Sequence, residues 1–145
     1  GFADRARWYG DPAFTTVPEN RVYVSADRAA AFTHAFLAFS HGRVVSDEEK
    51  APGIEIGLPD QTFHRLRIES VFGRMTVLVT DGHLPFPYGR EMTGYETADL
   101  DATLQKARES GAEILVEPYQ SGERRVAMVE FPGGYIAEIH AVAAH

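Results

Sequence analysis

The stretch from residue 94 to residue 139 constrains the fold more than any other part of the chain, because it fits one β-α-β-β-β unit. A strand is expected at residues 92–98. Asp99 then begins a helix as its N-cap, since its carboxylate can accept hydrogen bonds from the free amides of the first turn. Gly111 supplies the left-handed residue that ends this helix. The helix has one apolar face, made of Leu100, Thr103, Leu104 and Ala107.

Three strands are expected after this helix, at residues 113–117, 124–131 and 135–142. Pro132-Gly133-Gly134 forms the turn between the last two strands. No helix follows these glycines, so they do not read as a nucleotide-binding loop.

The motifs of this stretch resemble the second half of a glyoxalase / bleomycin-resistance / extradiol-dioxygenase domain, the vicinal oxygen chelate superfamily. The resemblance lies in YETADLDATLQKARESGAEILVEP followed by FPGGYIAEI. A DLDAT helix start, a GAEIL turn into a strand and a P-x-G-x-x-x-E ending occur there in order, across about a third of the chain. The resemblance implies a fold of class α+β, in which paired β-α-β-β-β modules form a curled mixed sheet around a cavity.

The first half of the chain repeats this order of elements. A strand is expected at residues 21–25, Asp27 as the next helix N-cap, and Gly42 as the end of that helix. The apolar face of this helix consists of Ala29, Phe32, Phe36 and Phe39. Strand-like runs follow at residues 43–46, 53–58, 63–69 and 75–80, with an acidic insertion, SDEEKAPG, among them.

One vicinal-oxygen-chelate-type domain spanning residues 1–145 is therefore expected. Its parts are an N-terminal arm at 1–19, a first module at 20–81, a Pro- and Gly-rich linker at 82–91 and a second module at 92–145. Two interpretations of the arm stay open, packing along a sheet edge or exchange with a partner subunit. The resemblance also implies a homodimer.

Composition excludes several functional classes. A net charge of −7 argues against a nucleic-acid surface, which needs a basic footprint. No apolar run approaches the ~20 residues that span a bilayer, so no membrane partner is expected. The absence of cysteine excludes disulfides and Cys-type zinc sites. A soluble protein is expected, and because the chain does not begin with Met, both a cytoplasmic and an exported mature form stay open.

In the family a divalent metal is held by four positions, on the first and last strands of each module. The resemblance carries the last-strand position of the second module onto Glu138. The other positions fall on Met92, on Glu19 or Asn20, and on Val77. Met and Val are poor ligands for such cations. No cofactor is therefore favoured, and a divalent metal held by Glu138 is the alternative.

Histidine adds a second candidate beside this acid. His140 lies two residues beyond Glu138, so strand alternation puts both side chains on one sheet face. Such a pair could bind a metal or act as an acid/base pair, which makes both candidate catalytic residues. The alternative is a histidine that only forms a hydrogen bond with the carboxylate at the rim of the cavity.

The strand at residues 63–69 supplies candidate anion-binding residues. His64, Leu66 and Ile68 suit its packed face, so Arg65 and Arg67 point the other way. The resemblance places that other face in the cavity, where guanidinium groups would bind carboxylate or phosphate. The alternative pairs these arginines with acids such as Glu55, Glu69 or Glu130.

The remaining candidate ligand-binding residues are Val77, Met92, Gly94 and Glu96. The last three share one face of their strand by alternation. Gly94 leaves room for a ligand, and an irregularity at the strand edge is the alternative interpretation.

Two functional classes stay open. The first is a protein that binds a small, anionic organic molecule without a metal, as resistance-type members of the family do. The second is a metal-dependent lyase, isomerase or dioxygenase of the same superfamily. The fold alone cannot choose between them, but the mismatched ligand positions favour the first.

Overall fold

The computed structural model describes residues 17–143 and divides the chain into two compact units. Residues 19–92 form one unit, and the residues from Thr93 onward lie in the other. The predictions for the N-terminal arm fall mainly on residues 1–16, which lie outside the described residues.

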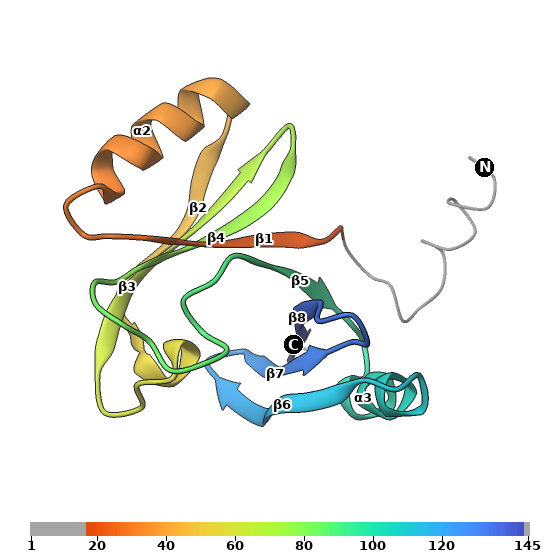
Figure 1. Ribbon diagram of the computed structural model, residues 1–145. Helices are drawn as coiled ribbons and strands as arrows, with labels where there is room; N and C mark the ends of the chain where they lie inside the picture. Colours follow the sequence, from red (N-terminus) through yellow and green to blue (C-terminus); the bar gives the residue numbers. More distant parts are fainter. Residues whose placement is uncertain (1–16, 144–145) are drawn as a thin grey trace. The chain divides into compact units, whose positions relative to one another are not determined.

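The first module has the order β1 (Glu19–Val24), α2 (Ala29–Ser40), β2 (Arg43–Pro52), the 3-10 helix η1 (Gly53–Ile56), β3 (Thr62–Ser70) and β4 (Gly73–Val79). Its strands lie in the order β2-β3-β4-β1 (Figure 1). β2, β3 and β4 are antiparallel neighbours, whereas β1 pairs with β4 in parallel.

The second module has the order β5 (Met92–Glu96), α3 (Leu100–Glu109), β6 (Glu113–Ser121), β7 (Arg124–Glu130) and β8 (Ile136–Val142). Its strands lie in the order β5-β8-β7-β6, with β5 parallel to β8 and the other pairs antiparallel. This is the topology of the first module, so the predicted repeat of two β-α-β-β-β modules in an α+β fold with mixed sheets is confirmed.

α3 begins and ends where the sequence predicts. The Asp99 carboxylate accepts a hydrogen bond from the amide of Ala102 at 3.0 Å. Gly111 has φ +92° and donates its amide to the Arg108 carbonyl, which closes the helix. The buried residues of α3 are Leu100, Leu104 and Ala107.

α2 corrects two predictions. Arg28, not Asp27, is its N-cap residue, and no side chain caps the helix. The Asp27 carboxylate instead accepts from the Ser25 hydroxyl at 2.6 Å. At the other end His41, with φ +52°, takes the left-handed position expected of Gly42.

The middle of the first module corrects two further predictions. The acidic stretch is not an insertion between strands, because its first residues continue β2 up to Pro52. The run at 53–58 is not a strand, because Gly53–Ile56 is the 3-10 helix η1. Its backbone is tied to residues around it, since the Leu58 amide donates to Gly53 and the Gly53 amide donates to Gln61. A Cβ at Gly53 would lie 2.0 Å from the Leu58 carbonyl oxygen, so this close approach needs glycine.

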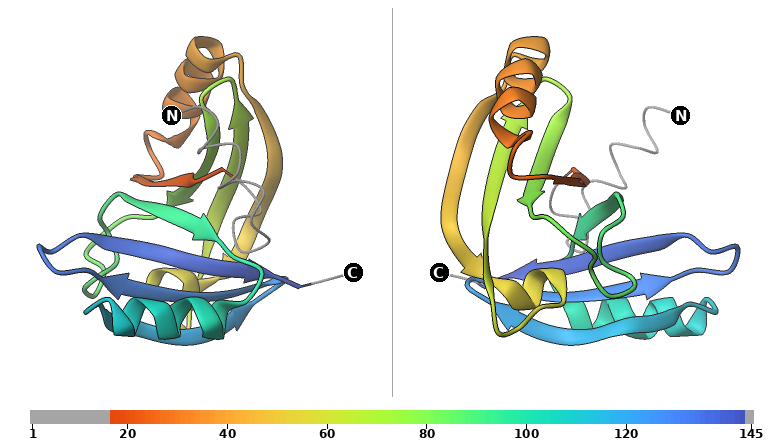
Figure 2. Two further views of the ribbon diagram at one scale, coloured as in Figure 1. Left: turned by 90° about the vertical axis from the view of Figure 1, so that its right-hand side faces the viewer. Right: turned by 60° about the vertical axis from the view of Figure 1, so that its left-hand side comes forward.

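Each helix covers one face of its own sheet (Figure 2). Under α2 the buried core consists of Ala29, Leu66, Ile68, Met75, Val77 and Val79. Under α3 it consists of Leu100, Leu104, Ala127, Val129, Ala137 and Ile139. A smaller cluster of Ala51, Ile56, Phe63 and Leu78 lies on the other face of the first sheet, where η1 packs. Among residues 17–143 no helix is long and apolar enough to cross a membrane.

Candidate functional site

The sheet face of the second module that points away from α3 carries Glu138 and His140. Both belong to β8, which has a neighbouring strand on each side, β5 and β7. Their exposed fractions are 3% and 0%. The Oε1 atom of Glu138 lies 2.6 Å from Nδ1 of His140. An ionised carboxylate can only accept, so Nδ1 carries the proton in this hydrogen bond when Glu138 is charged.

β5 brings a second carboxylate to the same histidine. Its register places Gly94 opposite Glu138 and Glu96 opposite His140. Oε1 of Glu96 lies 3.5 Å from Nε2 of His140, a buried nitrogen that makes no hydrogen bond within the described part of the chain. The imidazole therefore lies between two carboxylates. It forms a hydrogen bond with one of them, Glu138, and lies near the other, Glu96.

The other predicted residues of β5 line the same face. Met92, Gly94 and Glu96 alternate along the strand, and Met92 and Gly94 are buried. Gly94 adds no side chain beside the Glu138 carboxylate. Tyr135, just before β8, is 47% exposed, and its hydroxyl lies 2.8 Å from that of Tyr95.

The corresponding sheet face of the first module carries arginines. Arg65 and Arg67 lie opposite Leu78 and Thr76 of β4, on the face turned away from α2. β1 adds Arg21, which pairs in register with Thr76 and is 4% exposed. Arg74 reaches the same face, because it contacts the carboxylate of Glu19 on β1. Four guanidinium groups thus share one sheet face.

Two carboxylates of the first module contact this arginine face. Both oxygens of Glu55, on η1, lie 2.5 Å from Nη1 of Arg65, and the two side chains are 9% and 14% exposed. The sequence left two interpretations of Arg65 open, binding of an anion or pairing with an acid such as Glu55. The structure shows the pairing with Glu55. Glu19, 2% exposed, accepts a hydrogen bond from the Thr76 hydroxyl and lies 3.4 Å from Nη2 of Arg74.

Val77 does not share the face of the arginines. It is fully buried beneath α2 with Leu66 and Ile68, whereas its neighbours Thr76 and Leu78 point to the arginine face. The expectation that Val77 lines a ligand site with Arg65 and Arg67 is therefore off by one residue. His64 lies on the α2 side, and its Nε2 is 2.6 Å from the Asp47 carboxylate.

Sequence reasoning missed Arg21, Tyr23 and Tyr88. The run ENRVYV alternates Glu19, Arg21 and Tyr23 with other residues, and this alternation could have marked them as one face. Burial raises the pKa of Tyr88, the nearby Tyr23 adds to the rise, and Arg21 lowers it in part. Tyr88 comes from the linker, and its ring packs against Gly57. A linker side chain thus lies within electrostatic range of the arginine face.

The residues present do not fit a divalent metal. Among residues 17–143 no group of three His, Asp or Glu side chains could hold a metal ion. Glu19 occupies a position that the resemblance assigns to a ligand, but it already bonds to Thr76 and Arg74. Met92 and Val77, at two other positions, offer no hard donor atom.

The sequence matches no known family model and no curated protein, but the fold matches solved structures. Methylmalonyl-CoA epimerase from Mycobacterium tuberculosis is 12% identical, with a TM-score of 0.65 over 92% of each chain. A single-residue variant of Streptomyces coelicolor methylmalonyl-CoA epimerase, solved with 2-nitronate-propionyl-CoA, is 17% identical, with a TM-score of 0.64 over 91% of this chain and all of that one.

A third similar structure is a glyoxalase/bleomycin resistance protein/dioxygenase superfamily member from Vibrio splendidus 12B01. It is 16% identical, with a TM-score of 0.54 over 88% of this chain and 99% of that chain. At these identities the likeness concerns the fold. The predicted glyoxalase/bleomycin-resistance fold is confirmed.

Proposed function

We propose that this chain, which has the glyoxalase/bleomycin-resistance fold, binds a small organic anion without a metal, with the arginine face of its first module as the anion-binding surface. The observation that carries the proposal is the placement of Arg21, Arg65, Arg67 and Arg74 on one sheet face in a protein of net charge −7. Guanidinium groups in partly dry surroundings bind carboxylate and phosphate oxygens strongly.

The ligands of similar structures support this class of molecule. One methylmalonyl-CoA epimerase was solved with 2-nitronate-propionyl-CoA and another with methylmalonyl-CoA and NH4+. Both organic ligands carry negative charge. For this chain a carboxylate, phosphate or thioester-linked acid is the corresponding ligand class.

The arginines have different expected roles. Arg65 holds Glu55 and Arg74 holds Glu19, so both also serve the structure of the first module. Arg67 lies between them in register, opposite Thr76. We therefore expect Arg67 to contact the anion directly, and Arg65 to contribute as a second donor.

The test measures binding of methylmalonate, coenzyme A and inorganic phosphate by calorimetry, with dimethyl methylmalonate as a neutral analogue. Arg67→Ala should weaken binding of the preferred anion by roughly 10- to 100-fold, because a hydrogen bond to a charged group contributes about 1.5–3 kcal/mol. Arg43→Ala is the matched control, since Arg43 is 77% exposed and pairs with Glu69 on the protein surface. Equal affinities in all three proteins, or equal binding of the neutral analogue, would contradict the proposal.

Metal independence has its own test. A ligand that binds only the native state raises the melting temperature with its concentration. Zn²⁺, Mn²⁺ and Ni²⁺ are expected to leave the melting temperature of the parent and of Glu138→Ala unchanged relative to metal-free samples of each. A saturable rise in the parent that Glu138→Ala abolishes would overturn the metal-free proposal.

A second candidate function is acid–base catalysis by a lyase or isomerase, favoured by the position of His140 between Glu138 and Glu96. One of these groups would remove a proton from the carbon next to a carbonyl, and the same set would return it. The test follows solvent deuterium uptake into methylmalonyl-CoA by mass spectrometry. Uptake that Glu138→Gln and His140→Gln abolish, with anion affinity retained, would support catalysis. Binding without uptake would leave only the binding function.

A further inference from the structure

The hydroxyl of Tyr23 is a buried polar group that makes no hydrogen bond within the described part of the chain. Tyr23 lies on β1, where alternation puts its side chain on the same face as Arg21, the arginine face of the first module. A buried hydroxyl without a partner destabilises a folded protein, so native structures contain few of them. The ring packs against the apolar cluster of Ala51, Ile56, Phe63 and Leu78.

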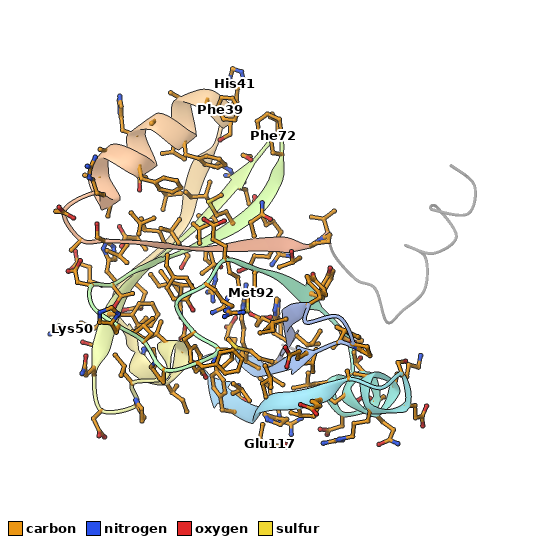
Figure 3. All side chains as sticks on the ribbon, in the orientation of Figure 1. Phe39, His41, Lys50, Phe72, Met92 and Glu117 are labelled. Carbon is orange, nitrogen blue, oxygen red and sulfur yellow. The ribbon has the colours of Figure 1, made fainter. Side chains whose placement is uncertain are left out.

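The strand register arranges the arginine face in rows that run across the sheet. Side chains extend from both faces of β1, β3 and β4 (Figure 3), and on the arginine face each row takes one residue from each strand. The middle row consists of Arg21, Thr76 and Arg67, and the next row consists of Tyr23, Leu78 and Arg65. Neighbouring rows are two residues apart along a strand, which is roughly 7 Å. A ligand that contacts both rows must therefore present two groups that are several bonds apart.

The two rows differ in charge. The middle row brings the guanidinium groups of two arginines to one surface. In the next row the charge of Arg65 is balanced by Glu55, whose two oxygens lie 2.5 Å from its Nη1. Beside this pair Tyr23 offers a hydroxyl donor next to the fully buried Leu78. Burial of a second charged group at this row would cost more than burial of an uncharged acceptor, because a charge loses more hydration.

The linker packs beside Tyr23. Leu84 packs against the same apolar cluster as the ring of Tyr23. The ring of Tyr88 lies against Gly57, where a Cβ would come within 2.7 Å of it. Burial raises the pKa of Tyr88, and the nearby Tyr23 adds to the rise. Because the Tyr23 oxygen is shielded from solvent, a ligand reaches it only by displacing neighbouring side chains, and those of the linker belong to no strand.

We infer that Tyr23 is a ligand-binding residue that selects the class of anion. The charged group of the ligand lies at the middle row, and an uncharged carbonyl oxygen several bonds away accepts a hydrogen bond from the Tyr23 hydroxyl. This inference rests on the proposed anion-binding function and narrows its ligand to a monoanion with a remote carbonyl, as in a keto acid. Such a ligand supplies the partner that the hydroxyl lacks within the described residues.

The test measures binding of two matched acids by calorimetry. 4-Oxopentanoate carries the carbonyl, and 4-methylpentanoate carries a methyl group in place of its oxygen. The parent should bind the keto acid roughly 10-fold more tightly, because only this acid accepts from the buried hydroxyl. Tyr23→Phe should abolish this preference, whereas Arg67→Ala should weaken binding of both acids. The pair 5-oxohexanoate and 5-methylhexanoate repeats the comparison with a longer spacing.

A second measurement uses the unliganded protein. Tyr23→Phe should raise the melting temperature by about 2–4 °C, because it removes a buried hydroxyl that has no partner. Tyr95→Phe is the matched control, since the Tyr95 hydroxyl already lies 2.8 Å from that of Tyr135. It should not raise the melting temperature, and it should leave the affinity for both acids unchanged. A lower melting temperature for Tyr23→Phe would show that its hydroxyl is already bonded in the free protein and would overturn the inference.

The outcomes separate this inference from the proposed function. If Arg67→Ala weakens binding but the parent binds the keto and methyl acids equally, or Tyr23→Phe keeps the preference, the role of Tyr23 is wrong and anion binding stands. If none of the four acids binds the parent, the role of Tyr23 is also wrong, and methylmalonate, coenzyme A and phosphate still test anion binding. If Arg67→Ala binds the acids as tightly as the parent does, the proposed function itself fails.

Discussion

The two modules share one topology, yet the sheet faces that point away from their helices differ in the charged side chains they carry. In the first module that face bears Arg21, Arg65, Arg67 and Arg74. In the second it bears Glu96, Glu138 and His140. The faces beneath the helices are alike in both modules and consist of aliphatic and small residues. The packing of the helices therefore accounts for the side chains on only one face of each sheet.

The helices differ as much as the sheet faces do. α3 has a side-chain cap at Asp99, a glycine at its end and a charged outer side, so local interactions stabilise it. α2 has no side-chain cap, and His41 takes the left-handed position at its end. Its stability must come from packing of Phe32, Phe36 and Leu37 onto the sheet.

The largest effect is expected at the buried Glu55–Arg65 ion pair of the first module, and it tests whether this pair stabilises the fold. Arg65→Ala should lower the free energy of unfolding by about 3–5 kcal/mol, because it leaves the Glu55 carboxylate buried without this partner. Arg125→Ala in the second module should cost at most ~1 kcal/mol, because Arg125 and Asp101 are 43% and 76% exposed. Urea unfolding followed by circular dichroism measures both.

A double variant controls for lost packing. Arg65→Met with Glu55→Gln removes both charges and should retain more stability than Arg65→Ala, since no buried charge is left unpaired. If Arg65→Ala costs no more than Arg125→Ala, the Glu55–Arg65 contact contributes little to stability. The contrast between a buried pair in one module and an exposed pair in the other would then fail.

A smaller loss of stability is expected at the helix starts, where the N-terminal ends of α2 and α3 can be compared. Asp99→Ala should destabilise the protein by about 1 kcal/mol, because the Ala102 amide loses its capping acceptor. Asp27→Ala should cost clearly less, because Asp27 caps no helix amide and only accepts from Ser25. Thermal unfolding of the two variants measures the difference. Equal losses would show that Asp27 supports α2 in solution as Asp99 supports α3.

The sequence predicted the second module more accurately than the first, and the reason is physical. The signals of α3, Asp99 and Gly111, act within a few residues of themselves, so they could be found without tertiary structure. The run GIEI alternates like a strand, but long-range backbone contacts with Gln61 hold it as η1. The acidic residues of β2 were interpreted as an insertion, although charge is common on strands at a sheet edge.

The candidate site was also predictable only where local alternation along one strand was sufficient. Alternation along one strand was enough to place Glu138 with His140, and Arg65 with Arg67. It failed for Val77, because residues 75–79 are buried on both faces of β4, so burial does not distinguish the two sides of this strand. The contact of Glu55 with Arg65 joins η1 to β3, and sequence alone offered several acids as equal partners.

The smallest effect concerns the hydrogen-bonded tyrosine pair of the second module, Tyr95 and Tyr135. Burial and a hydrogen bond with Tyr135 raise the pKa of Tyr95 to about 12, from an ordinary value of 10.0. The folded state therefore keeps this proton at a pH where the unfolded state has lost it. The resulting stabilisation is fully present below about pH 10 and is lost as the pH rises through about 12.

Tyr135→Phe should lower the pKa of Tyr95 and reduce this alkaline loss of stability. The ultraviolet absorbance of phenolate during an alkaline titration measures the change, with Tyr119→Phe as the control that removes a tyrosine elsewhere. If both variants titrate alike, the hydroxyl contact does not hold the proton on Tyr95.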